Sequence, residues 1–151
     1  MTKLKKIFIF PIFFLFFLGC GYTPIFSKKD VNFSIENIKF LGDKDVKEKI
    51  NHSLSNYRNK PNKEKKVSLI INSSKTINVA AKNLEGKAQT NRINVDVNVK
   101  IILTKNNFLE KNFNKSSVYS VIDRKSEQKL IENLSSKIAL QIIFEILKNT
   151  K

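Results

Sequence analysis

Few side chains in this sequence could carry out chemistry. The chain has one cysteine, Cys20, and one histidine, His52, so an intramolecular disulfide, a thiolate zinc site and a two-histidine metal site are excluded. The acidic residues are scattered singly, and the four glycines do not form a phosphate-binding loop. His52 lies off the apolar stripe of the helix expected around it, which favours a surface residue over a catalytic base. We therefore predict a binding or structural protein, not an enzyme, with no cofactor and no metal.

Cys20 follows a segment that is typical of a secretory signal. Lys3, Lys5 and Lys6 form a basic head, and residues 7–18 are apolar, broken only by Pro11. A helix needs about 20 residues to cross the hydrocarbon core of a membrane, so this shorter run fits the hydrophobic region of a signal peptide instead. We predict that residues 1–19 are a signal peptide that is removed from the mature protein.

The residues around the cysteine resemble a lipobox, the site at which a signal peptidase cuts before a lipid-modified cysteine. The sequence Phe17-Leu18-Gly19-Cys20 has the thiol and the preceding small residue that this chemistry needs, with Phe where Leu is usual. The resemblance implies lipidation of Cys20, and three acyl chains anchor a protein firmly in a membrane. Gly21 after the cysteine, rather than Asp, implies the outer membrane, on its periplasmic side. The alternative is a secreted protein that is cleaved nearby and keeps a free thiol.

The chain is strongly basic, with a formal net charge of +15 that falls to +12 once the three lysines of residues 1–19 are removed. One interpretation is compositional bias, because an excess of Lys and Asn is typical of an AT-rich coding sequence. The other is attraction to a polyanion, namely nucleic acid, anionic lipid or a phosphorylated glycolipid. A lipid-anchored protein outside the cytoplasm would not meet nucleic acid, so we exclude that partner.

The mature chain opens with a strand pattern and a helix pattern. Apolar and polar residues alternate over residues 31–40, with a slip at Glu36-Asn37 that predicts a β-bulge. Asp43 or Asp45 can cap a following helix, which should stop before Pro61. The apolar stripe of that helix is formed by Val46, Ile50, Leu54 and Tyr57.

Three further strands and a second helix complete the pattern. The strands are expected at residues 67–72, 93–103 and about 108–122, and the helix at residues 125–148. The last two strands should form a hairpin, and the strand at 93–103 alternates so regularly that one of its faces must be buried.

These elements predict an α+β fold, with two helices packed on one four-stranded, mostly antiparallel sheet. Residues 20–30 are expected to be a lipidated tether, and residues 31–151 a single α+β domain.

The sequence Cys20-Gly21-Tyr22-Thr23-Pro24-Ile25-Phe26 resembles the opening of the lipopolysaccharide-assembly lipoproteins, the LptE family. That family usually has Leu-Tyr where this chain has Ile25-Phe26, and its order of elements matches the one expected here. The resemblance implies an outer-membrane lipoprotein that plugs the lumen of a lipopolysaccharide-translocating β-barrel (LptD-like), helps the barrel to fold and binds lipopolysaccharide.

The resemblance also implies where lipopolysaccharide would bind. The family carries a basic cluster between its second and third strands, and Lys82, Lys87 and Arg92 occupy the matching stretch here. Solvated lysines of a loop are the alternative interpretation of the same residues. The rival function is a generic anchored lipoprotein that binds peptidoglycan or another envelope component.

Overall fold

The computed structural model describes residues 31–121 and 124–150, so the expected signal peptide, tether and lipidated Cys20 lie outside the described residues. The elements in chain order are β1 (Phe33–Gly42), α3 (Lys44–Leu54), the short 3-10 helix η1 (Ser55–Tyr57), β2 (Lys65–Lys82), β3 (Ala88–Thr104), β4 (Asn107–Ser120) and α4 (Arg124–Asn149).

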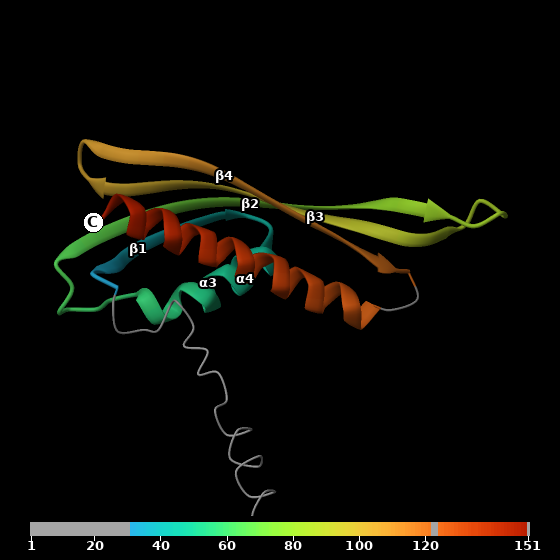
Figure 1. The fold of residues 1–151 in the computed structure, drawn as a ribbon, viewed down its shortest axis with the longest axis horizontal. Helices are drawn as coiled ribbons and strands as arrows, with labels where there is room; N and C mark the ends of the chain where they lie inside the picture. Colours follow the sequence, from blue (N-terminus) through green and yellow to red (C-terminus); the bar gives the residue numbers. More distant parts are fainter. Residues whose placement is uncertain (1–30, 122–123, 151) are drawn as a thin grey trace, which may run out of the picture. The chain divides into compact units, whose positions relative to one another are not determined.

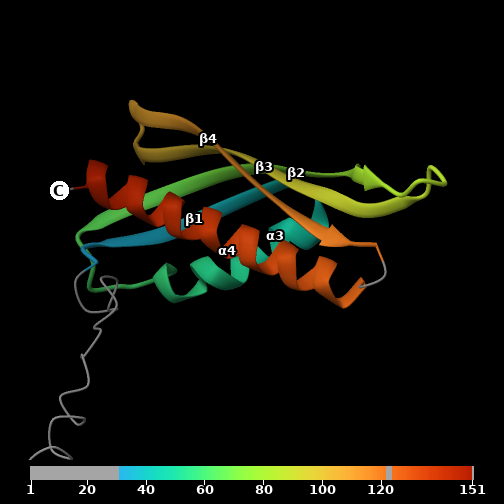
Figure 2. The same cartoon turned by 45° about the vertical axis from the view of Figure 1, so that its right-hand side comes forward.

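The strands form one sheet in the order β1-β2-β3-β4. β1 and β2 pair in parallel, because α3 carries the chain back between them, whereas β2, β3 and β4 pair antiparallel through hairpins. Figures 1 and 2 show that α3 and α4 lie on the same side of the sheet. The predicted α+β class, with a mostly antiparallel sheet and both helices on one face, is confirmed.

The core lies between the helices and the sheet, and the alternation in the strands explains it. On β3, Val95, Val97 and Val99 are buried toward the helices, whereas Asp96 and Asn98 between them are exposed on the opposite, open face. Burying one such apolar side chain stabilises the fold by about 1.5–3 kcal/mol. The strongest pattern in the sequence therefore marks the centre of the core.

α3 begins at a tight junction after β1. The backbone of Gly42 has φ +90, and a Cβ there would lie 1.8 Å from the carbonyl oxygen of Ser73, so only glycine fits. Asp43 then caps the helix, because its Oδ1 accepts from the backbone N–H of Val46 at 3.0 Å. The structure thus selects Asp43 over Asp45 as the cap, and the bulge expected at Glu36-Asn37 is also found, between Ile35 and Asn37.

α4 buries residues on more than one stripe because it packs against both the sheet and α3. Ser53 of α3 lies 3.3 Å from Ser136 of α4 between their hydroxyl oxygens, and Lys49 pairs with Glu132 at 3.4 Å. The buried apolar residues of α4 are Ile131, Leu134, Ile138, Ala139, Ile142, Ile143 and Ile146.

β2 and β3 are much longer than the sequence predicted. The strands expected at residues 67–72 and 93–103 extend to Lys82 and back to Ala88. β1 ends opposite Ser73 and β4 ends opposite Thr90, so the outer part of the β2–β3 hairpin has no further strand beside it. The prediction was wrong there because no helix covers this part, so the alternation continues only through the exposed Ile77 and Val79 and then stops.

We predict that Val97→Asp destabilises the protein far more than the neighbouring change Asn98→Asp. Val97 is 2% exposed, so a carboxylate there would lose its hydration without a partner, at a cost of about 3 kcal/mol or more. Asn98 faces solvent on the other side of the same strand, so its change should cost about 1 kcal/mol at most. Urea unfolding followed by circular dichroism measures both variants, and equal midpoints would contradict the assigned face.

Candidate functional site

The outer part of the β2–β3 hairpin is the first candidate surface. We call residues 77–91 the arm, and Figure 1 shows it extending beyond the ends of both helices. Residues 77 to 89 are all exposed. Ile77 and Val79 are among them, with 41% and 50% of their surface accessible, so the arm presents apolar side chains that nothing in the described chain covers.

The end of the arm is a well-built turn. The backbone N–H of Gly86 donates to the carbonyl of Asn83, and the Asn83 Oδ1 accepts from the backbone N–H groups of Glu85 and Lys87. Gly86 takes φ +79, which glycine adopts without strain. This turn holds Leu84 fully exposed at the tip. Sequence reasoning missed Leu84, because a single leucine in a polar loop gives no periodic signal.

The structure separates the three basic residues expected to bind a phosphorylated ligand. Lys82 and Lys87 lie together where the arm turns, because Lys82 pairs with Ala88 in the strand register. Arg92 lies five residues farther along β3, or about 17 Å at the strand rise. The tip therefore has two ammonium groups beside an exposed leucine, although Glu85 pairs with Lys87 at 2.9 Å. Whether these residues bind lipopolysaccharide stays a prediction.

A charged network joins β2 to the start of α3, next to the base of the arm. Lys75, on the helix side of β2, lies 2.5 Å from Asp45 Oδ2 and 3.8 Å from Asp43 Oδ2 at the start of α3. The hydrogen bond and the charge of Lys75 hold the pKa of the Asp45 carboxyl below its usual range. Partial burial lowers the pKa of Lys75, but the hydrogen bond to Asp45 and the two carboxylates outweigh this and raise it. The network fixes the place where the apolar core ends and the arm begins.

A second contact on the helix side ties β4 to α4. The Tyr119 hydroxyl donates to Glu127 Oε2 at 2.8 Å, close to the start of α4. Burial, followed by this hydrogen bond to a carboxylate, raises the pKa of Tyr119, which keeps the phenol protonated as the donor. The arm thus leaves the sheet between two anchored helix ends.

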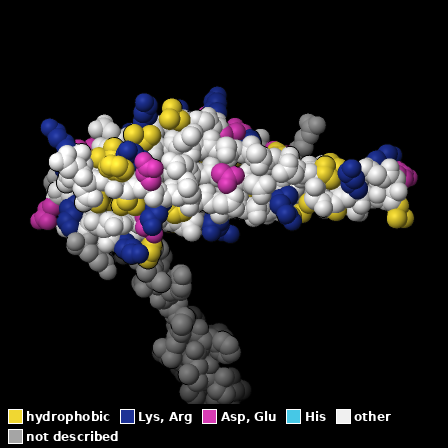
Figure 3. Space-filling view, turned by 90° about the horizontal axis from the view of Figure 1, so that it is seen from above, with side chains coloured by type: hydrophobic (Ala, Val, Ile, Leu, Met, Phe, Trp, Pro, Cys, Tyr) yellow, Lys and Arg dark blue, Asp and Glu magenta, His cyan; other side chains and the backbone are white. Residues whose placement is uncertain are grey.

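The open face of the sheet is the second candidate surface. Its centre carries five asparagines and an aspartate, which we call the amide patch. These residues are Asn72, Asn94, Asp96, Asn98, Asn112 and Asn114. Figure 3 views this face from above and shows it mostly white between its ends, because amide and hydroxyl side chains carry no charge. Sequence analysis predicted a wet strand face but did not identify the patch, since it depends on the pairing of three strands.

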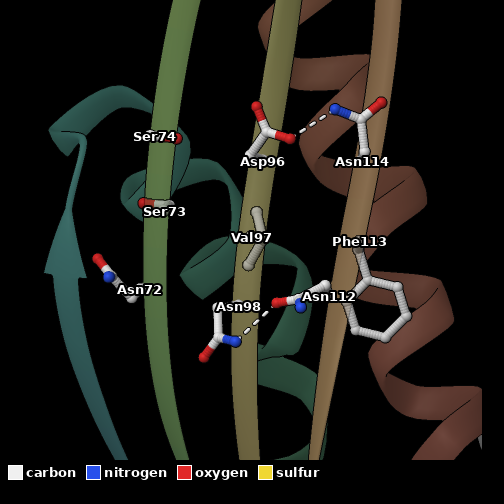
Figure 4. Close-up of a pocket in the computed structure, with 9 residues that line it drawn as sticks. All are labelled: Asn72, Ser73, Ser74, Asp96, Val97, Asn98, Asn112, Phe113 and Asn114. Atoms are coloured by element: carbon white, nitrogen blue, oxygen red, sulfur yellow. Dashed lines mark hydrogen bonds between the residues drawn. The ribbon is translucent and has the colours of Figure 1, made fainter.

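Side chains of the amide patch meet in pairs across β3 and β4. Asn98 Nδ2 donates to Asn112 Oδ1 at 2.6 Å, and Asn114 Nδ2 donates to Asp96 Oδ1 at 2.5 Å (Figure 4). The patch borders a shallow depression of about 250 Å³. Its amide groups can donate and accept hydrogen bonds.

The described residues offer no site for metal chemistry or for a membrane-spanning helix. No group of three His, Cys, Asp or Glu side chains in residues 31–121 and 124–150 is arranged to hold a metal ion. No helix in the same part of the chain is long and apolar enough to cross a membrane. His52 is exposed on α3, where the sequence placed it.

Comparison with known proteins gives a likeness of fold. No protein-family model and no curated protein matches the sequence. Among solved structures, rare lipoprotein B from Shewanella oneidensis matches with a TM-score of 0.54 at 11% identity, covering 76% of this chain and 96% of that one. A minor lipoprotein from Acinetobacter baumannii matches with a TM-score of 0.53 at 12% identity, covering 76% and 92%. An uncharacterized lipoprotein B from Nitrosomonas europaea matches with a TM-score of 0.53 at 11% identity, covering 82% of this chain and 90% of that one.

We predict that Lys75→Met removes part of the acid sensitivity of folding. The folded pKa of Asp45 lies below its ordinary value of 3.8, so the contact stabilises the protein above about pH 4 and this stabilisation is lost as the pH falls through the folded pKa. The urea midpoint of the variant should therefore fall furthest below that of the unaltered protein near neutral pH, and the gap should narrow toward pH 3.

Lys87→Met is the matched control, because Lys87 pairs with Glu85 at 2.9 Å on an exposed surface and does not contribute to the pKa shift of Asp45. Its midpoint should follow that of the unaltered protein at every pH. A gap for Lys75→Met that stays constant from neutral to acid pH would show that the contact with Asp45 contributes nothing.

Proposed function

We propose that this protein is an outer-membrane lipoprotein that plugs a lipopolysaccharide-translocating β-barrel, helps that barrel to assemble and contacts lipopolysaccharide through its arm. It is anchored through acylated Cys20 on the periplasmic side. The observation that carries the proposal is the shared fold: two helices on one face of a four-stranded sheet, as in three lipoproteins whose lengths are covered almost completely. The lipobox-like sequence at Cys20 supports the same assignment.

The open face supports the role of a plug. The interior of a large outer-membrane barrel is polar and filled with water, so a protein inside it needs a hydrophilic surface that does not aggregate. The exposed residues at the centre of the sheet are amides, hydroxyls and one carboxylate, and the exposed apolar side chains of the same face, Leu41, Phe108 and Val118, lie around this centre. The protein can therefore lie against a polar wall without losing any of its core.

The arm supports the contact with lipopolysaccharide. Its tip combines the ammonium groups of Lys82 and Lys87 with the fully exposed Leu84. Phosphates would bind the lysines, each worth about 1 kcal/mol near an anionic lipid surface. Acyl chains would cover the leucine, which is costly to leave in water.

Co-purification tests the partner. The full chain with a C-terminal tag, extracted from membranes in mild detergent, should recover a large β-barrel in a one-to-one ratio. Mass spectrometry of the same sample should show acyl groups on Cys20. An unrelated tagged lipoprotein from the same membranes is the control. Recovery of acylated protein with another envelope component and no barrel would support the generic lipoprotein instead.

Charge reversal tests the arm. Lys82→Glu with Lys87→Glu should weaken binding to lipopolysaccharide vesicles at low salt by at least about tenfold, because two attractions become repulsions. Lys47→Glu with Lys137→Glu changes the net charge equally on exposed helix positions and should change binding by about twofold at most. Arg92→Glu, measured separately, shows whether the more distant arginine takes part. Equal losses for the tip pair and the helix pair would mean that general charge, not the arm, drives binding.

A further inference from the structure

The amide patch has more hydrogen-bonding capacity than the sheet uses. A carboxamide carries two N–H donors and an oxygen with two acceptor sites. Asn98, Asn114 and Asn94 each donate one cross-strand hydrogen bond, the last to Thr76 Oγ1 at 3.4 Å. Each therefore keeps a second N–H donor and acceptor capacity that these hydrogen bonds do not use. The patch therefore offers both kinds of group side by side to whatever lies against it.

The charge of the patch is unusual for this chain. The sequence has 28 basic residues and a net charge of +15, yet the open face of β3 carries no Lys or Arg between Arg92 and Lys100, and the single charge of the patch is that of Asp96. A phosphate ligand would need cations, and an apolar partner would need exposed aliphatic or aromatic side chains. The patch itself has neither, with Arg92 at its border toward the arm and Leu41 beside Asn72, so its charge and polarity match a neutral ligand rich in hydroxyl groups. A sugar hydroxyl donates and accepts, as the carboxamides do.

Size and boundaries fit a short saccharide. From Asn94 to Asn98 the patch measures about 14 Å along β3, and from β2 to β4 about 10 Å across the strands. Its far end, away from the arm, is closed by Lys100, which pairs with Glu110 at 3.5 Å and so adds little net charge. The depression of about 250 Å³ lies within these limits. Figure 4 shows the paired amides lying across it.

The patch also lies in line with the arm. β2 and β3 run continuously from the tip to the patch, and Asn94 follows Lys87 by seven residues, or about 24 Å of strand. A glycolipid whose phosphates and acyl chains meet the tip would direct its saccharide along the same strands. The polar face begins where the arm joins the covered part of the sheet.

We propose that the amide patch binds the neutral saccharide chain of the glycolipid whose phosphates meet the arm tip. The identity of this glycolipid rests on the function proposed above. Binding is made of hydrogen bonds between sugar hydroxyls and the free amide groups of Asn94, Asn98 and Asn112. Raising the salt concentration should leave it nearly unchanged, because no cation of the patch pairs with a phosphate.

Nuclear magnetic resonance of the full chain in detergent micelles, labelled with ¹⁵N, tests the proposal. The probe is the saccharide released from lipopolysaccharide by mild acid and then dephosphorylated. The side-chain amide signals of the patch should shift on titration, at low and at high salt alike. The double variant Asn98→Thr with Asn112→Thr keeps a residue that favours strands at both positions. It should lower the affinity for the saccharide by about tenfold. Asn56→Thr with Asn62→Thr, at exposed positions off the sheet, should leave the affinity within about twofold.

Several outcomes would overturn the proposal. These are an absence of amide shifts, equal effects of the two double variants, or shifts confined to the tip lysines. Equal or tighter binding of soluble peptidoglycan glycans at the patch would overturn the assigned source. If the amide signals of the patch shift only when a barrel protein is added, the patch is a protein interface instead. The proposed function is tested separately, by the recovery of a barrel in co-purification and by the effect of charge reversal at the tip on binding to lipopolysaccharide vesicles.

Discussion

Both helices pack against the same face of the sheet, and the rest of the structure depends on this one-sided burial. The parallel pairing of β1 and β2 requires a crossover, and α3 makes that crossover on the side where α4 later packs. Every strand position then belongs to one of two environments. Val97 supports the core, while Asn98, one residue farther along the strand, can only face outward. The amide patch is the direct result.

The extent of helix coverage defines the second functional feature. The apolar row of β2 ends at Ile71 and gives way to Ser73 and Lys75, which meet the start of α3 through hydrogen bonds and charge rather than through packing. The backbone N–H of Asp43 donates to the carbonyl of Ser73 at 2.9 Å at this point. Beyond it β2 continues without a helix over it, whereas β3 stays buried as far as Ile93 and β4 stays tied to α4 at Tyr119. Core, arm and patch thus share β2 and β3 but differ in what covers them.

Much of the covered half could be predicted from the sequence, because burial there leaves a local pattern. The alternation around Val97, the slip at Glu36-Asn37 and a helix cap at Asp43 or Asp45 each follow from neighbouring residues alone, and the structure selects Asp43. The arm could not be predicted in the same way. With no helix over residues 77–89, the alternation of Ile77 and Val79 with Asn78 stops at Ala80 and is too short to predict a long strand.

The candidate sites depend on contacts between distant residues. Asn98 meets Asn112 only because β3 and β4 pair in one particular register. Likewise, Arg92 is near Lys87 in sequence, yet an extended strand carries it about 17 Å away. The sequence motif at Cys20 predicts where the protein is located in the cell. The geometry of the two surfaces, in contrast, can be known only once the pairing of the strands is known.

The turn at Asn83 is held by its own hydrogen bonds, but the arm that carries it is only two strands wide near its end, β2 and β3. Such a ribbon resists bending far less than a sheet backed by helices, since displacing it breaks no buried apolar contact. The tip can therefore swing as a short lever while its shape is preserved. Lys75 and Tyr119 fasten the strands to the helices at the base of this ribbon, so bending of the ribbon does not require the covered half to move.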